Sequence, residues 1–188
     1  MQVDANTLRK GHVVDYNGKL WAVIKSEIMI PGKGAAVIQV EMRDVRAGVK
    51  TNVRFRTQET VERVQLHEQE MQFLFASGDE YTFMDQTTYE QLVVPREIIG
   101  DPVVFLQESM ICTVMTYEGK ALSVELPSTV TLEITEADPV VKGQTASSSY
   151  KPAKLSNGVR IMVPPFIGTG TRVVVNTADG SYIERARD

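Results

Sequence analysis

Apolar and polar residues alternate one by one along much of this chain, and that period restricts it to β-structure. Residues 38–43 place an apolar side chain at every second position, as in a strand with one buried face. Residues 53–56 read Val-Arg-Phe-Arg, which puts Arg54 and Arg56 together on the solvent face of another strand. The pair Asn17-Gly18 predicts a tight two-residue hairpin. The fold class expected is all-β.

The strands fall into three successive groups, which predict three small β-barrels joined tightly in an elongated array. Residues 1–64 favour an SH3-like (KOW-like) barrel, since closure removes exposed sheet edges. Residues 65–127 favour an OB-fold with a helix over residues 89–99, and residues 128–188 a second OB-fold. Strands are expected in the second group at Met71–Phe75, Glu80–Met84, Val103–Leu106, Met110–Tyr117 and Ala121–Leu126, and in the third at Val130–Thr135, Val159–Val163, Thr171–Asn176 and Ser181–Arg185.

Two long strand-like runs, residues 20–30 and 35–45, flank a Pro-Gly-Lys-Gly sequence. This arrangement predicts a β-hairpin whose exposed tip is formed by Pro31, Gly32, Lys33 and Gly34. The two glycines leave the backbone free to adopt positive φ, and the proline fixes φ on the approach. Lys33 could then reach a polyanionic site or serve a modifying enzyme as substrate. An ordinary glycine-rich hairpin with a solvated lysine is the alternative for this sequence alone.

Charge is unevenly distributed along the chain. Residues 1–64 hold 11 Lys/Arg and 7 Asp/Glu, a balance of +4, whereas residues 65–127 hold 2 and 11, a balance of −9. Residues 128–188 hold 7 and 6, so the three balances sum to the net charge of −4. A basic first module can neutralise phosphates, although each arginine alone also fits a solvated strand position. The RNA-contact candidates are Lys25, Arg43, Arg54 and Arg56, with Arg46 and Lys50 beside them.

Groups that would support catalysis or a cofactor are not apparent in the sequence. There are only two histidines, and Cys112 is the single cysteine, which suggests a core or strand residue rather than a zinc ligand or disulfide. No phosphate-binding glycine loop precedes a helix. No apolar run is long enough to cross a bilayer, and the start lacks signal-peptide features. We therefore expect a cytoplasmic protein with no cofactor, no metal and no membrane association.

Three segments near the C-terminus carry a resemblance. Residues 151–158 (Lys-Pro-Ala-Lys-Leu-Ser-Asn-Gly), residues 163–167 (Val-Pro-Pro-Phe-Ile) and residues 176–182 (Asn-Thr-Ala-Asp-Gly-Ser-Tyr) are similar to signatures of the bacterial elongation factor P family. The lysine tip and the order of modules resemble that family too. The hypusine-containing translation factor of eukaryotes and archaea is the related alternative, but it lacks a third module.

The resemblance implies a translation factor that is not an enzyme. Such a factor binds both ribosomal subunits beside the peptidyl-tRNA and relieves stalling at consecutive prolines. Lys33, extended by a lysine-modifying enzyme, would order the tRNA acceptor end, and the protein would act as a monomer. The loop that approaches the small subunit would contain Gly143, Ser147 and Ser148, in a serine-rich segment where many relatives have more glycine.

Two other functions compete with this one. A general RNA-binding protein of OB type would not depend on Lys33. An enzyme whose site forms from residues distant in sequence would show turnover as a purified protein.

Overall fold

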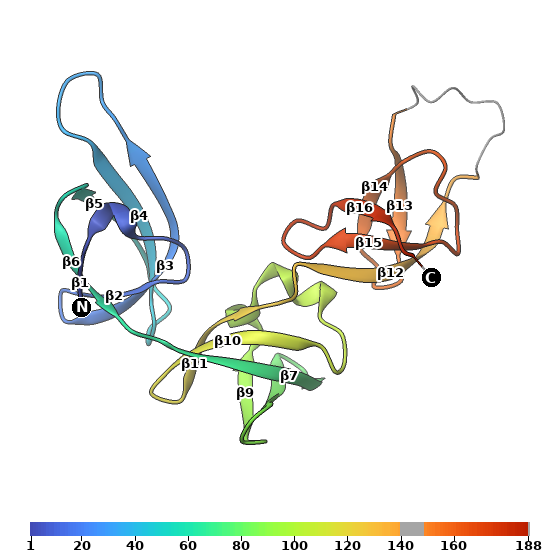
Figure 1. The fold of residues 1–188 in the computed structure, drawn as a ribbon, viewed down its shortest axis with the longest axis horizontal. Coiled ribbons are helices and arrows are strands. Elements are labelled where there is room, and N and C mark those ends of the chain that lie inside the picture. Colours follow the sequence, from blue (N-terminus) through green and yellow to red (C-terminus); the bar gives the residue numbers. More distant parts are fainter. Residues whose placement is uncertain (140–148, 188) are drawn as a thin grey trace. The chain divides into compact units, whose positions relative to one another are not determined.

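The computed structural model describes residues 1–139 and 149–187, and its strands form three sheets (Figure 1). The described residues divide into two compact units. One unit comprises Met1–Gln69 with Val114–Val124, and the other contains the remaining described residues. The all-β prediction is confirmed. None of the helices among the described residues is long and apolar enough to cross a membrane.

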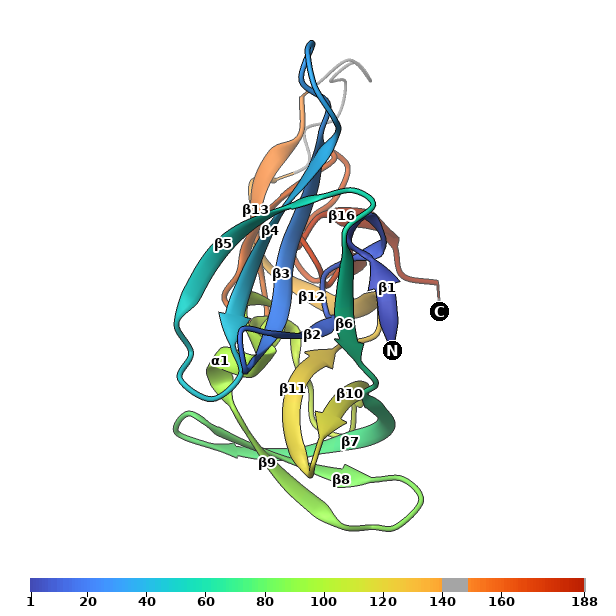
Figure 2. The ribbon, with the colours of Figure 1, turned by 90° about the vertical axis from the view of Figure 1, so that its left-hand side faces the viewer.

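The first sheet has the strand order β1-β6-β2-β3-β4-β5. Its longest hairpin, β3–β4, extends well beyond the other strands (Figure 2). Asn17 and Gly18 take φ values of 52° and 76° in the β2–β3 turn, which confirms the predicted two-residue hairpin. The strands are β1 (Gln2–Asp4), β2 (Val13–Tyr16), β3 (Lys19–Met29), β4 (Val37–Asp44), β5 (Lys50–Arg56) and β6 (Thr60–Val64), with a 3-10 turn at Ala5–Thr7.

The core of this sheet follows the predicted alternation. Ile38, Val40 and Met42 are fully buried on one face of β4. Phe55 of β5 packs edge-on against Tyr16, with ring centroids 5.6 Å apart. Trp21 donates its indole N–H to the Tyr16 carbonyl at 3.0 Å, so its polar atom is satisfied within the core. This core supports the base of the β3–β4 hairpin.

Asp44 organises the turn between β4 and β5. Its Oδ1 accepts the backbone N–H groups of Arg46 at 2.8 Å and Ala47 at 3.1 Å, and Lys19 lies 3.7 Å from Oδ2. The hydrogen bonds from Ala47 and Arg46 hold the pKa of this carboxyl below its ordinary value, against an opposing effect of burial. The ionised carboxylate therefore stabilises the turn that leads into β5.

We expect Asp44→Ala to lower the melting temperature at neutral pH, because two backbone donors lose their acceptor. A carboxyl with a lowered pKa stabilises the fold above its ordinary pKa of 3.8 and loses that contribution as pH falls through the lowered value. The difference in melting temperature between wild type and variant should therefore shrink at acid pH. Thermal unfolding from pH 7 to pH 3 measures it, and a pH-independent difference would contradict this account of Asp44.

The second sheet has the order β11-β10-β7-β8-β9. Phe73 of β7 and Phe83 of β8 are register partners, and their rings pack 5.4 Å apart. Cys112 is buried in β10, as predicted, and burial raises the pKa of its thiol to about 11. The strands are β7 (His67–Ser77), β8 (Glu80–Asp85), β9 (Gln91–Pro95), β10 (Ile111–Tyr117) and β11 (Lys120–Glu125), with helix α1 (Arg96–Ile99) and the 3-10 turn η2 (Asp101–Phe105).

Two element predictions for this sheet are wrong. The segment predicted as a helix, residues 89–99, contains strand β9 at Gln91–Pro95, and only Arg96–Ile99 is helical. Pro95 disfavours helical geometry at Val94, whose side chain is instead fully buried in register with Tyr81. The predicted strand Val103–Leu106 lies largely in η2, because the backbone turns at Gly100 (φ 77°) and Pro102 follows near the helix start.

The third sheet has the order β14-β13-β12-β15-β16. The four strands predicted here are confirmed within one to two residues at each end. The sequence reading missed β13, whose short Lys-Pro-Ala-Lys-Leu segment carries few strand-forming side chains. It is held by pairing with both β12 and β14. The strands are β12 (Thr129–Ala137), β13 (Lys151–Leu155), β14 (Arg160–Val163), β15 (Arg172–Asn176) and β16 (Tyr182–Arg185).

Candidate nucleic-acid interface

The tip of the β3–β4 hairpin presents Lys33 to solvent. The last register pair of the hairpin is Met29 with Val37, and residues 30–36 close the turn. Residues 31–34 are all exposed, as the sequence predicted. Lys33 makes no hydrogen bond or ion pair with any residue that the structure describes. Its amine is therefore available to a ligand or to an enzyme.

The two tip glycines differ in conformation. Gly34 has a φ of 127°, a region that residues with a Cβ rarely adopt, whereas Gly32 is outside the positive-φ region. The expectation that both would need this freedom therefore holds for Gly34 alone. A Cβ added at Gly32 would meet no atom within 4 Å, and one at Gly34 would lie 3.8 Å from Pro31 Cγ.

This difference gives a matched pair of variants. We expect Gly34→Ala to strain the tip by about 1–3 kcal/mol and to displace Lys33 as the loop relaxes. Gly32→Ala should leave the tip in place. Translation of a reporter should fall several-fold in Gly34→Ala alone, and thermal unfolding should show a melting temperature lowered in Gly34→Ala and unchanged in Gly32→Ala. Equal activity of the two variants would show that the Gly34 conformation does not matter.

The strand register places the predicted RNA-contact residues on one face. In an antiparallel pair, residues directly opposite each other project to the same side. Gln39 is the partner of both Glu27 and Arg54, and Val37 is the partner of both Met29 and Arg56. The outer face of β3–β4–β5, which we call the basic face, also carries Lys25, Glu41, Asn52, Arg43 and Lys50.

A β-bulge in β3 produces this arrangement. The register shifts between Val23 and Lys25, so Ile24 is an extra residue in the strand. Val23 faces the core, and beyond the bulge Lys25 and Glu27 face outward. Without the shift, Lys25 would project to the same side as Val23, away from the arginines of β5.

The basic face is not uniformly cationic. It holds five cations and two carboxylates, Glu27 and Glu41, which leave a balance of +3. Lys50 lies 3.9 Å from Glu41, and Arg43 is half-buried with a buried Nε that has no hydrogen-bond partner. Arg54, Arg56 and Lys25 are the exposed cations nearest the tip. They are consequently the strongest phosphate-contact candidates among the predicted residues.

The sequence reading also missed residues that shape this interface. Ile28, Met29 and Ile30, immediately before the tip, are 48%, 42% and 80% exposed. Their apolar sequence could be seen, but one side of a strand of this length is normally buried. Exposure of all three side chains was therefore not expected. The outward side of Glu27 was missed because the β-bulge at Ile24 shifts the alternation of β3, whereas that of Glu41 follows from the regular alternation of β4.

Two further points of the sequence analysis concern the small-subunit loop and metal binding. The proposed small-subunit residues Gly143, Ser147 and Ser148 lie outside the described residues. Within the described ranges there is no group of three or more His, Cys, Asp or Glu side chains that could hold a metal ion.

Family models and curated relatives match this chain over nearly all of its length. Three family models cover successive segments: "Elongation factor P (EF-P) KOW-like domain" at residues 4–61, "Elongation factor P (EF-P) OB domain" at 66–124, and "Elongation factor P, C-terminal" at 130–185. Elongation factor P of Rhodospirillum centenum is 62% identical over 188 residues, and that of Acidiphilium cryptum 54% over 187, each match covering 100% of both chains.

A solved structure, "Eukaryotic translation initiation factor 5A from Methanococcus jannaschii", is 24% identical with a TM-score of 0.45, covering 68% of this chain and 92% of that one. The family models and full-length relatives define an all-β translation factor with KOW-like and OB domains. The chain belongs to the elongation factor P family. It is thus a translation elongation factor that acts on the ribosome.

Proposed function

We propose that this protein binds the ribosome beside the peptidyl-tRNA and promotes peptide-bond formation at consecutive prolines. The observation that carries the proposal is the isolated amine of Lys33, held beyond the basic face at the exposed end of a hairpin whose base packs in the core. Phosphates of the tRNA acceptor stem lie against Lys25, Arg54 and Arg56, and the tip enters the peptidyl transferase centre.

The chemical role of Lys33 is positional. Proline is a conformationally restricted nucleophile, and ordering the tRNA end lowers the entropic part of the barrier. A cation among phosphates and sugars supplies that order without proton transfer. An enzyme extends Lys33 and so lengthens the reach of the cation. Gly34 and Pro31 set the direction in which it leaves the hairpin.

The rest of the chain follows the same proposal. The domains are residues 1–64, 65–127 and 128–188, and the protein acts as a cytoplasmic monomer that contacts both ribosomal subunits. Gly143, Ser147 and Ser148 belong to the segment that approaches the small subunit. No cofactor takes part.

The test is synthesis of a triple-proline reporter in a reconstituted translation system that lacks the factor. Natively purified protein should restore full-length product, while a reporter with alanines in place of the prolines should not respond. Rising salt should weaken ribosome binding if phosphate contacts dominate. No restoration of the proline reporter would favour the general RNA-binding alternative, and a flat salt response would count against the basic face.

A further inference from the structure

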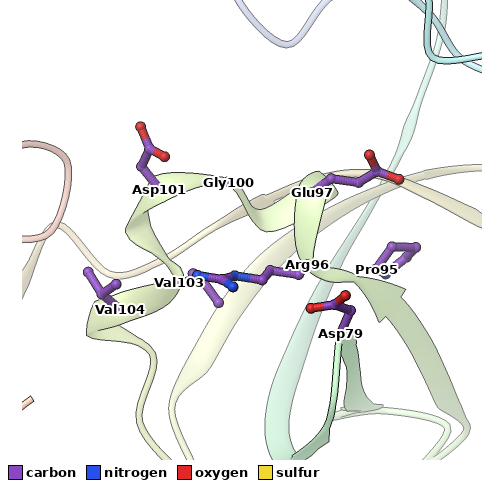
Figure 3. A pocket seen from close by; sticks show the side chains of 8 residues that line it. All are labelled: Asp79, Pro95, Arg96, Glu97, Gly100, Asp101, Val103 and Val104. Atoms are coloured by element: carbon purple, nitrogen blue, oxygen red, sulfur yellow. The ribbon is translucent and has the colours of Figure 1, made fainter.

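Two hollows flank the 3-10 turn η2, far along the chain from the Lys33 tip. The first, of about 610 Å³, is lined by Asp79 of the β7–β8 turn and by residues of β9, α1 and η2, and is shown in Figure 3. The second, of about 550 Å³, is lined by η2 and by residues of the third sheet and its turns. Asp101 and Val104 line both hollows. We call these two neighbouring hollows together the η2 groove.

Exposed apolar side chains gather in the second hollow. Val104, Tyr150 and Met162 are 42%, 54% and 50% exposed, and all three line it. The Tyr150 ring meets Tyr182 edge-on, with centroids 6.4 Å apart. Large apolar side chains that share one exposed hollow mark an interaction surface more often than isolated ones do. This part of the groove is suited to an apolar or aromatic side chain.

The net negative charge of the groove favours a cationic partner. The first hollow holds the carboxylates of Asp79, Glu97 and Asp101, and the second adds Asp179. Among the described residues that line the two hollows, only Arg96 and Arg160 oppose them, so four acids against two bases leave −2. In Figure 3 the Arg96 side chain extends toward Val103, and none of these groups forms an ion pair within the described part of the chain.

Asp179 remains ionised because Ser181 donates to its Oδ1 from both the hydroxyl, at 2.6 Å, and the backbone N–H, at 2.9 Å. These bonds lower the pKa of the Asp179 carboxyl. A polyanion such as RNA would be repelled by this set of charges. A cationic side chain would be attracted, and the tyrosine rings add a cation–π surface.

The walls of the groove are held in place by direct contacts. The Asn157 side-chain amide donates to the Val104 carbonyl at 2.9 Å. Gly180 lies so close to the Phe105 ring that a Cβ there would be 3.2 Å from Cζ. The Thr177 hydroxyl donates to the Pro127 carbonyl at 2.6 Å. The groove is therefore formed before a ligand arrives, which lowers the cost of binding.

We propose that the η2 groove is a docking surface for an extended protein segment in which Lys or Arg alternates with apolar side chains. A cation of the segment lies among Asp79, Glu97 and Asp101, and an apolar side chain lies over Val104 and between Tyr150 and Met162. The interaction is separate from the proposed function, because it uses neither Lys33 nor the basic face.

The test is an amide NMR titration of the full-length protein with three probes. These are acetyl-Arg-Leu-Arg-Leu-Arg-amide, its counterpart with Glu in place of Arg, and a short oligouridylate. The basic peptide alone should shift the amides of Val104, Gly180 and Tyr182. Binding should weaken by about tenfold in Val104→Ser/Tyr150→Ser, and also in Asp101→Asn.

Phe166→Ser is the matched control, since Phe166 is 58% exposed and lies outside both hollows. It should bind the basic peptide like wild type, and the amide spectrum of each variant reports its folding. Shifts at these amides with oligouridylate would overturn the proposal in favour of RNA. Equal shifts from both peptides, or none from the basic one, would also overturn it.

Discussion

Lys33→Ala is expected to abolish the activity that we propose for this factor at consecutive prolines. The side chain has no partner among the residues that the structure describes, so its loss should leave the melting temperature unchanged. Synthesis of a triple-proline reporter should fall to the level seen without factor, because nothing else at the exposed tip carries a positive charge. The measurement is full-length product in the reconstituted system, with an alanine reporter as the unaffected control.

Lys33→Arg separates charge from modification. It keeps the cation but offers a lysine-modifying enzyme no amine, so natively purified Lys33→Arg should be about as inactive as Lys33→Ala. Full activity of Lys33→Arg would refute the modification, and full activity of Lys33→Ala would remove the tip from the mechanism.

The second large effect is expected from reversing two charges on the basic face. Arg54→Glu/Arg56→Glu should weaken ribosome binding by about tenfold or more at low salt, because two phosphate contacts become repulsive. The dependence of log K on log salt should lose about two units of slope. Both side chains are exposed on β5, and their register partners on β4, Gln39 and Val37, are unchanged. The fold should therefore persist.

The matched control reverses Arg172 and Arg185, which are exposed on β15 and β16 of the third sheet. It alters the net charge equally but leaves the basic face intact, and ribosome binding should change far less. Equal losses from the two double variants would mean that overall charge, and not this face, governs binding. If Arg54→Glu/Arg56→Glu bound RNA poorly while Lys33→Ala stayed active, the general RNA-binding function would be favoured.

The sequence predicted most clearly what depends on neighbouring residues. The alternation over residues 38–43, the Asn17-Gly18 turn and the exposed tip all follow from local period and turn chemistry, and the structure confirms them. The segment 89–99 was misjudged because its strand form depends on pairing with β8, a contact distant in sequence. Tertiary pairing outweighed the helix-like signals there.

The candidate site, like the fold, was predicted where it depends on neighbouring residues and missed where it depends on distant ones. Lys33 stood out because glycines and two long strands surround it, and the arginines of β5 follow from strict alternation. The position of Glu27 on the same face does not follow from alternation, since the bulge at Ile24 exchanges the inward and outward side chains of β3 beyond it. The η2 groove also escaped notice, because Asp79, Val104 and Tyr150 are far apart in the chain and meet only after folding.

The bulge at Ile24 limits how the length of the β3–β4 hairpin can vary. Every single residue gained or lost in one strand exchanges inward and outward side chains from that point to the tip. Deleting Ile24 is the exception, because it removes the bulge and Lys25 then follows Val23 in regular alternation, with Lys25 and Glu27 still facing outward. Deleting a residue beyond the bulge, such as Ser26, would instead turn Glu27 toward the core side. Homologous or engineered hairpins can therefore differ in reach only by paired two-residue steps if Met29 and Val37 are to stay on the side of Arg56.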